Sequence, residues 1–262
     1  PAMTRYLIEK GADVNALVSL NGPDHFSTPL MVALSTCSVD TARRLIERGA
    51  DVRARGHSHQ TPMTTAISSC PQAIELLLAS GVNVNEQTRY GPPLLIAARY
   101  QWPSLAHGGS FFAFSRVAEE IKQHQGDAVK ILIEKGADPN AGDSEGRNAL
   151  MAMSLEPRPD NDAKIIVQAG GTRESRQQLR RNDKAVEIIG ETLLNAGCDV
   201  NAADNKGRTP LIYAVASERS EVVNLLLKRG ANIYAKDHNG ESALDWAIKT
   251  GDAEIIRLLS FR

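Results

Sequence analysis

Apolar residues between positions 208 and 235 fall in two short blocks, each with the three- and four-residue spacing of an amphipathic helix. Thr209 and Pro210 open the first block, since threonine offers an oxygen to unpaired N–H groups and proline lacks the donor that would be wasted there. The second block covers 221–228, and Gly230 follows it as a left-handed residue that ends a helix. The pattern predicts two short helices, a unit too small to bury both of its faces.

Copies of this unit recur along the chain. The ending, an aliphatic block followed by Gly-Ala-Asp-Val-Asn or a variant, is anchored at Gly11, Gly49, Gly81, Gly136, Gly197 and Gly230. Successive anchors are 38, 32, 55, 61 and 33 residues apart. The beginning, Thr-Pro-Leu or a variant, recurs at residues 28, 61, 92, 148, 209 and 242. Units of this kind are expected to stack in a line, each burying the faces of its neighbours.

A period near 33 residues with Thr-Pro-Leu at the front of the first helix resembles the ankyrin repeat. The resemblance spans nearly the whole chain and implies an all-α solenoid of stacked helix-turn-helix units with hairpin-like loops. It implies one domain over 1–262, with a partial repeat at 1–16 and repeats at about 17–54, 55–86, 87–141, 142–202, 203–235 and 236–262. The family's histidine after Thr-Pro-Leu is replaced by Met31, Thr64, Leu95, Met151, Ile212 and Asp245. The hydrogen bond of that histidine is therefore expected to be absent.

Two adjacent repeats carry long insertions, at 101–126 and 155–182. Recognisable helices flank them, at 93–100 and 127–135 around the first, and a continuous helix over 174–189 is expected at the end of the second. In the ankyrin arrangement both insertions leave from the edge opposite the hairpin tips. We therefore expect them to pack together as one ordered lobe.

The charge balance is nearly even, with 30 Lys and Arg against 31 Asp and Glu. This argues against a general nucleic-acid binder or a membrane-surface protein, and no apolar run reaches the length of a membrane span. We expect no membrane insertion and a monomeric chain in the cytoplasm. No signal peptide is visible, although the chain opens inside a repeat.

Cys37 and Cys70 share one repeat position, and Cys198 is the third cysteine. Stacked helices lie about 8–10 Å apart, farther than a disulfide tolerates between Cα atoms. Reduced thiols and a reducing compartment are expected, although a periplasmic protein without disulfides would look the same.

Two strings have the form of catalytic motifs. Residues 142–146 match Gly-x-Ser-x-Gly, and His107-Gly-Gly-Ser is similar to an esterase oxyanion loop. The nucleophile elbow needs a strand before it and a helix after it. Here the string shares its register with the turn sequences at 204–207 and 237–240, so we interpret it as a turn.

The other candidate for chemistry is a metal site. His57-x-His59 with Cys70 lacks a fourth ligand at suitable spacing. The sequence therefore predicts no catalytic residue, no metal and no cofactor.

Candidate binding residues come from three places. Hairpin tips and the exposed positions of first helices form the concave surface of ankyrin proteins. A basic run at 173–184 is either a face for an acidic partner or a solvated face, and the aromatic residues of the first insertion either anchor a partner or seal the insertion onto the solenoid. The predicted partner-binding residues are His57, His59, Arg89, Tyr90, Trp102, Phe111, Phe112, Glu145, Arg147, Arg176, Arg180, Lys206, Arg208 and His238.

The function predicted from this resemblance is binding of another protein, without enzyme activity, through the concave face, the hairpin tips or the insertion lobe. Two alternatives stay open. The chain is either the regulatory or recognition part of a longer enzyme or effector, or an inhibitor of the immunity type that binds a toxin.

Overall fold

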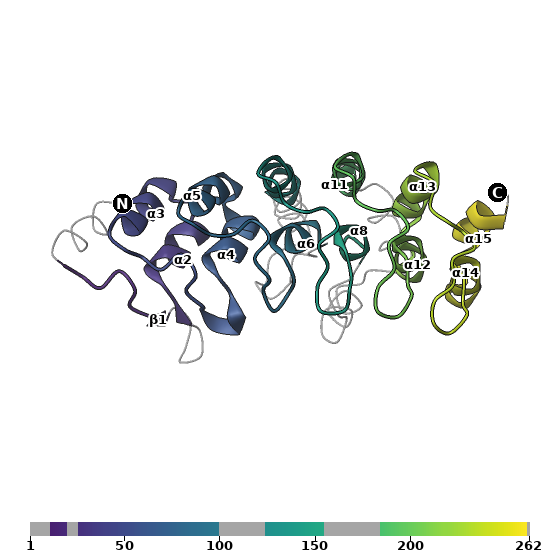
Figure 1. Ribbon diagram of the computed structural model, residues 1–262, viewed down its shortest axis with the longest axis horizontal. Coiled ribbons are helices and arrows are strands. Elements are labelled where there is room, and N and C mark those ends of the chain that lie inside the picture. The colour runs from purple at the N-terminus through teal and green to yellow at the C-terminus, as the bar shows by residue number, and fades with distance from the viewer. Residues whose placement is uncertain (1–10, 20–25, 100–123, 155–183, 261–262) are drawn as a thin grey trace, which may run out of the picture.

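The computed structural model describes residues 11–19, 26–99, 124–154 and 184–260. Its helices form two rows that run the length of the molecule, with the connecting loops projecting on one side (Figure 1). Helices contact their partner in the same pair, and one of the rows is in contact from end to end through the equivalent helices of neighbouring pairs. The predicted all-α solenoid is confirmed.

The helices of the inner row begin after the recurring Thr-Pro-Leu signal. They are α2 (Pro29–Ser35), α4 (Pro62–Ser69), α6 (Pro93–Ala98), α8 (Ala149–Ala152), α12 (Pro210–Ala216) and α14 (Ala243–Thr250). The helices of the outer row precede the recurring glycine. They are α3 (Val39–Glu47), α5 (Ile74–Ala79) with the 3-10 turn η2 (Pro71–Ala73), the helix at 124–134, α11 (Lys184–Asn195), α13 (Ser220–Lys228) and α15 (Ala253–Ser260).

Side-chain caps start five of the inner helices. The oxygens of Thr28, Thr61, Asn148, Thr209 and Ser242 each accept the backbone N–H three residues further on. A cap of this kind satisfies a donor that the helix leaves unpaired. The Thr209 cap predicted from the sequence is confirmed, and Gly230 has the expected positive φ of 83°.

The sequence predicted that the position of the family's histidine makes no side-chain hydrogen bond. In two repeats it does make one. Thr64 Oγ1 and Asp245 Oδ2 each accept the backbone N–H of their helix N-cap residue at 2.8 Å. Both therefore complete a capping box. The expected loss of a side-chain hydrogen bond at this position is wrong for these two repeats, because each has gained a shorter polar side chain that bonds locally.

A single line of apolar side chains lies between the two rows. Its largest fully buried members are Leu30, Met31, Leu34, Leu45, Ile67, Ile74, Leu77, Leu94, Leu95, Leu132, Leu150 and Met151. They come from successive pairs, so the core is continuous from one end of the described chain to the other. Each pair thus gains its burial from its neighbours.

Asparagines at the end of the repeat signature link neighbouring units on the outer side. Asn140 Nδ2 donates to Gly197 O at 3.0 Å, and its Oδ1 accepts Asp199 N–H at 2.7 Å. Asn15 makes the same two bonds, to Gly49 O at 3.0 Å and from Asp51 N–H at 2.7 Å. One short side chain therefore fixes the spacing between two units.

Several helix limits differ from those predicted. The helix expected at 127–135 covers 124–134, and the one expected at 93–100 ends at Ala98. α11 continues to Asn195, past the expected end at 189. Most of the two insertions lies outside the described residues, so their packing into one lobe stays a prediction, as do the repeat limits.

A disulfide joins Cys37 to Cys70, with 4.9 Å between the two Cα atoms, and the prediction of reduced thiols at these positions is wrong. The distance between helix axes does not apply to these two Cα atoms, because neither cysteine lies inside a helix. Cys37 follows the last turn of α2 in the left-handed region, with φ 47°. Cys70 caps α4 with an extended φ of −151°. The two connections leave their helices in different directions and meet between the units.

Breaking this disulfide should destabilise the N-terminal units. The bond closes a loop of 33 residues, for which loop-closure entropy gives about 3–4 kcal/mol. We expect Cys37→Ser/Cys70→Ala to lower the melting temperature by about 5–10 °C in a thermal scan followed by circular dichroism. Dithiothreitol should lower that of the wild-type protein by a similar amount and leave the double variant unchanged.

Thiol titration checks the bond directly. Cys198 is 5% exposed, its Sγ donates to Pro139 O at 3.1 Å, and burial raises the pKa of its thiol to about 12. The native protein should be unreactive, the unfolded unreduced protein should show one thiol, and the reduced protein all three. Three reactive thiols without a reductant would contradict the disulfide.

Candidate functional site

Three successive hairpin loops in the C-terminal half are each built around an aspartate, Asp143, Asp204 and Asp237. In every case Oδ1 accepts the backbone N–H groups two and four residues further on, at 2.8–3.1 Å. Asp204 and Asp237 are buried, at 6% and 5% exposed. Because the carboxylate satisfies the donors inside the loop, each hairpin is held in one conformation.

The tips of these hairpins are also bonded to each other. Asn205 N–H donates to Glu145 O at 2.9 Å, and His238 N–H donates to Lys206 O at 2.9 Å. Gly207 makes room for this approach, since its φ is 75° and a Cβ there would lie 2.7 Å from the His238 ring. The three loops therefore form one continuous ordered edge.

The second oxygen of each aspartate faces the inner helices. Asp143 Oδ2 accepts Arg147 Nε–H at 2.8 Å, Asp204 Oδ2 accepts the Tyr213 hydroxyl at 2.8 Å, and Asp237 Oδ2 accepts Trp246 Nε1–H at 3.4 Å. An aromatic residue nine positions after the aspartate is thus tied to the hairpin of its own repeat in the last two of these units.

These side chains alternate along the molecule. Tyr213 interacts with the charges of both Arg147 and Arg208. The Arg208 guanidinium lies 4.9 Å from the centre of the Trp246 ring, and Lys249 Nζ lies 5.2 Å from the centre of the same ring. Such contacts are attractive because a cation meets the negative face of the ring. We call Arg147, Tyr213, Arg208, Trp246 and Lys249 the charged–aromatic row.

Protonation in this row is fixed at neutral pH. Burial raises the pKa of Tyr213, and its hydrogen bond to Asp204 raises it further. Burial would also raise the pKa of Asp237, but hydrogen bonds from the backbone N–H groups of Glu241 and Asn239 outweigh it and hold that pKa below its ordinary value. Tyr213 is therefore a neutral donor and Asp237 a charged acceptor.

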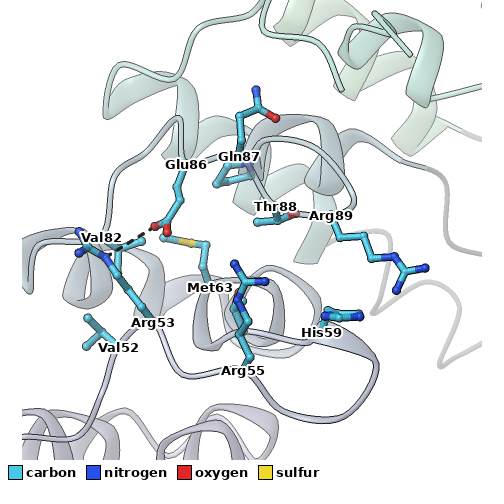
Figure 2. A pocket seen from close by; sticks show the side chains of 12 residues that line it. Val52, Arg53, Arg55, His59, Met63, Val82, Glu86, Gln87, Thr88 and Arg89 are labelled. Carbon is cyan, nitrogen blue, oxygen red and sulfur yellow. Dashed lines mark ion pairs between the residues drawn. The ribbon is translucent and has the colours of Figure 1, made fainter. Parts of the chain in front are cut away.

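A groove of about 220 Å³ lies in the N-terminal half, between the hairpin loop at 51–61 and the next loop at 82–91. Figure 2 shows Arg55, His59 and Arg89 on one side of it and Met63 inside it. We call it the arginine groove, and define it by Val52, Arg53, Arg55, His59, Thr61, Met63, Val82, Glu86, Gln87, Thr88, Arg89 and Pro93.

The structure brings some of the predicted binding residues together. His59 and Arg89 share the arginine groove, whereas Arg147 and Arg208 belong to the charged–aromatic row. The other described candidates lie on the hairpin loops, namely His57, Tyr90, Glu145, Lys206 and His238. Trp102, Phe111, Phe112, Arg176 and Arg180 lie outside the described residues. A binding role for any of them stays a prediction.

Sequence reasoning missed several residues that build these two sites. Arg53 and Arg55 were not chosen, although both lie in the same loop as His59. Tyr213 and Trp246 are also absent from the predicted set. The signal that would have found Tyr213 and Trp246 is their shared spacing, since each follows the loop aspartate of its own repeat by nine residues.

Of the two strings with the form of catalytic motifs, His107-Gly-Gly-Ser lies outside the described residues. Residues 142–146 form a hairpin turn, in which Gly146 N–H donates to Asp143 O at 2.9 Å, so the interpretation as a turn is confirmed. Cys70 is in a disulfide and does not complete a metal site with His57 and His59. Among the residues that the structure describes, no group of three or more His, Cys, Asp or Glu side chains could hold a metal ion. Nor does any helix in those residues have the length and apolarity needed to cross a membrane.

Comparison with known proteins gives the family. The profile described as Ankyrin repeats (3 copies) matches residues 1–88 and 180–261, well over half of the chain. The chain belongs to the ankyrin repeat family. Ankyrin repeats are protein-interaction modules, and the family is generally non-enzymatic.

Relatives of this ankyrin repeat chain are longer proteins. Inversin from Canis lupus familiaris is 28% identical over 215 residues, covering 76% of this chain and 18% of inversin. The E3 ubiquitin-protein ligase KEG from Arabidopsis thaliana is 28% identical over 165 residues, covering 62% of this chain and 9% of the ligase. The chain therefore spans less than a fifth of either relative.

A solved structure shares the fold. It is the Bd0816 predatory endopeptidase from Bdellovibrio bacteriovorus in complex with the immunity protein Bd3460. A chain of that complex matches with a TM-score of 0.58 and 20% identity, over 90% of this chain and 98% of its own length. At this identity the likeness is one of fold.

The loop aspartates should be important for stability in proportion to their burial. Asp204→Ala removes the acceptor of two backbone N–H groups and of the Tyr213 hydroxyl, so we expect the free energy of unfolding to fall by about 1–3 kcal/mol. Asp199→Ala is the control, since exposed Asp199 accepts one backbone N–H, that of Asn201, two residues further on. Urea unfolding followed by circular dichroism measures both, and equal losses would contradict the role of burial.

Proposed function

We propose that the chain binds another protein through the hairpin edge and the charged–aromatic row. The observation that carries the proposal is that three successive repeats present partly exposed arginine, tyrosine and tryptophan side chains, held in place from below by buried aspartates. These residue types dominate the binding energy of protein interfaces.

Preorganisation supports this surface as a binding site. The tip-to-tip hydrogen bonds and the loop aspartates fix the backbone before any partner arrives. A surface that is already ordered loses little conformational entropy on binding, so more of the contact energy goes into affinity. Membership of the ankyrin repeat family supports the same conclusion.

The proposal has two more specific forms, which differ in the role of the bound complex. In the solved relative of this fold, an endopeptidase is bound to an immunity protein, which favours an inhibitory role of the immunity type. In KEG and inversin the matched region is a small part of a longer protein, which favours a recognition segment that serves other domains. We favour the first, because the solved likeness covers 90% of this chain and almost the whole of its counterpart.

The disulfide bears on where this binding takes place. Disulfides form and persist in oxidising compartments, whereas cytosolic thiols are kept reduced. Cys37 is exposed to solvent, so cytosolic reductants would reach the bond. We therefore propose an oxidising compartment in place of the cytoplasm expected from the sequence.

A capture experiment tests the proposal. Purified wild-type chain is immobilised and exposed to lysate of the source organism, and retained proteins are identified by mass spectrometry. We expect Glu145→Arg/Lys206→Glu to lose most of at least one specifically retained protein, because these changes reverse two charges on the hairpin edge.

The matched control exchanges two charges on the outer helix of one unit. Lys130→Glu/Glu134→Arg leaves the net charge unchanged, as the loop variant does, and alters two exposed residues of the outer helix at 124–134. This control should retain the partner at the wild-type level. Equal retention by all three proteins would exclude the hairpin edge, and an absence of any specific protein would count against the binding function itself.

A further inference from the structure

The arginine groove carries an excess of basic side chains. Arg53, Arg55, Arg89 and His59 line it, and Glu86 is the one acidic residue among its lining side chains. The whole chain carries a net charge of −1, so this excess of cationic groups is local.

The single acid of the groove is already engaged. Glu86 Oε2 lies 3.9 Å from Arg53 Nε, and the same guanidinium donates through Nη2 to Gly81 O at 2.8 Å. Arg55 and Arg89 are exposed and make no hydrogen bond or ion pair with any residue in the described part of the chain. Two guanidinium groups of successive repeats are thus left to pair with something else.

Arg53 occupies a position that is asparagine in other repeats. Asn15, Asn140 and Asn201 donate from Nδ2 to the glycine carbonyl of the following unit, at 3.0, 3.0 and 3.4 Å. At the junction of the second and third units, Arg53 makes the equivalent bond to Gly81 O. The bond to the glycine carbonyl is kept, but arginine cannot accept the backbone N–H that the asparagine oxygen accepts at other junctions, and a neutral amide is replaced by a cation beside the groove.

The two loops that carry the free guanidinium groups are fixed in place. Gly56 N–H donates to Gln60 O at 2.8 Å, and a Cβ at Gly56 would lie 2.8 Å from Phe26 O, so this loop is pressed against the preceding unit. His59 has a left-handed φ of 62°. The second loop is closed by the paired bonds between Thr88 and Gly91, both 3.1 Å. The groove is therefore formed before a ligand arrives.

The floor of the groove is apolar. Met63 is 3% exposed, Val82 is 7% exposed, and Pro93 is buried. The volume of about 220 Å³ is below the range of about 300–1,000 Å³ that is usual for small-molecule pockets. Its size and lining fit an apolar side chain that enters the groove next to a charged one on the rim.

We propose that the arginine groove binds an acidic segment of a protein partner, with a carboxylate between Arg55 and Arg89 and a neighbouring aliphatic side chain over Met63. Guanidinium groups pair with carboxylates through directed, charge-assisted hydrogen bonds. This inference rests on the proposed protein-binding function and adds the chemistry of the bound segment. A nucleic acid is disfavoured because the chain as a whole is not basic.

Selection from a phage-displayed library of random linear peptides tests this directly. The immobilised full chain is the wild type, Arg55→Glu/Arg89→Glu, or the control Arg43→Glu/Lys130→Glu, which makes the same charge change at exposed positions of outer helices away from the groove. We expect wild type and control to select peptides with Asp or Glu beside Leu, Ile or Met. The groove variant should not enrich them, and circular dichroism should show all three proteins equally folded.

The selected peptide is then titrated by fluorescence anisotropy. We expect the groove variant to bind at least about tenfold more weakly than wild type, with the control unchanged. Replacing the acidic residue of the peptide by its amide should cause a similar loss, and the two losses should not add, because they remove the same contact. Binding by the wild type should weaken as salt is raised.

Other outcomes overturn the inference in distinguishable ways. Selected peptides without an acidic excess, or acidic peptides that bind the groove variant equally well, would reject the acidic segment and leave the protein-binding function standing. Tighter binding of a peptide with phosphoserine in place of the acidic residue would make phosphate the ligand. Failure to select any peptide on any of the three proteins would count against a groove for linear segments, while the capture experiment on the hairpin edge judges the wider function.

Discussion

The structure depends on burial between neighbouring units, because none of its helix pairs is large enough to bury its own apolar faces. Inner helices of four to eight residues supply one side of each pair, far below the length at which an isolated helix is stable in water. Contacts between equivalent helices of neighbouring units make the assembly cooperative. Everything that holds the spacing between units therefore also holds the surface that they present.

Four devices set that spacing, and they lie at different places on the units. Asparagine side chains link the units at the signature that ends each repeat, and backbone bonds link the hairpin tips from 145 to 238. The Cys37–Cys70 disulfide adds a covalent tie at the opposite end of the first inner helices. Gly190 contributes through packing, since the Leu225 side chain occupies the space that a Cβ there would need, with its Cδ2 at 2.4 Å. The stiffness of the surface thus comes from many small contacts between neighbours.

Much of the architecture could be predicted because short sequence motifs that repeat along the chain determine it. Thr-Pro-Leu with its cap, the aliphatic blocks and the closing glycine each act within a few residues, and six copies in phase leave little ambiguity. The disulfide could not be found in this way, since it depends on how two connections bend: Cys37 turns left-handed while Cys70 is extended. The helix-axis spacing used for the prediction describes the middle of a helix, and these residues lie beyond its ends.

The candidate sites were predictable only in part for a related reason. Loop positions such as His59 and Arg89 can be identified from the repeat register, but the register does not say which side chains are already engaged. Arg53, Arg147 and Arg208 are held by acidic residues, whereas Arg55 and Arg89 are not held by any described residue. Pairing of this kind depends on the direction of long side chains across two or three units, which the sequence spacing of one unit does not fix.

The exchange of asparagine for arginine at position 53 shows how such a scaffold acquires an individual character. The carbonyl of Gly81 is satisfied either way, although arginine gives up the second bond, in which the asparagine oxygen accepts a backbone N–H. Because each junction between units has its own hydrogen bonds, a charged residue can be introduced at one junction without disturbing the rest of the stack. A stack of near-identical units can in this way present a different set of side chains at every junction. Relatives of the same shape can therefore come to recognise unrelated molecules through single substitutions.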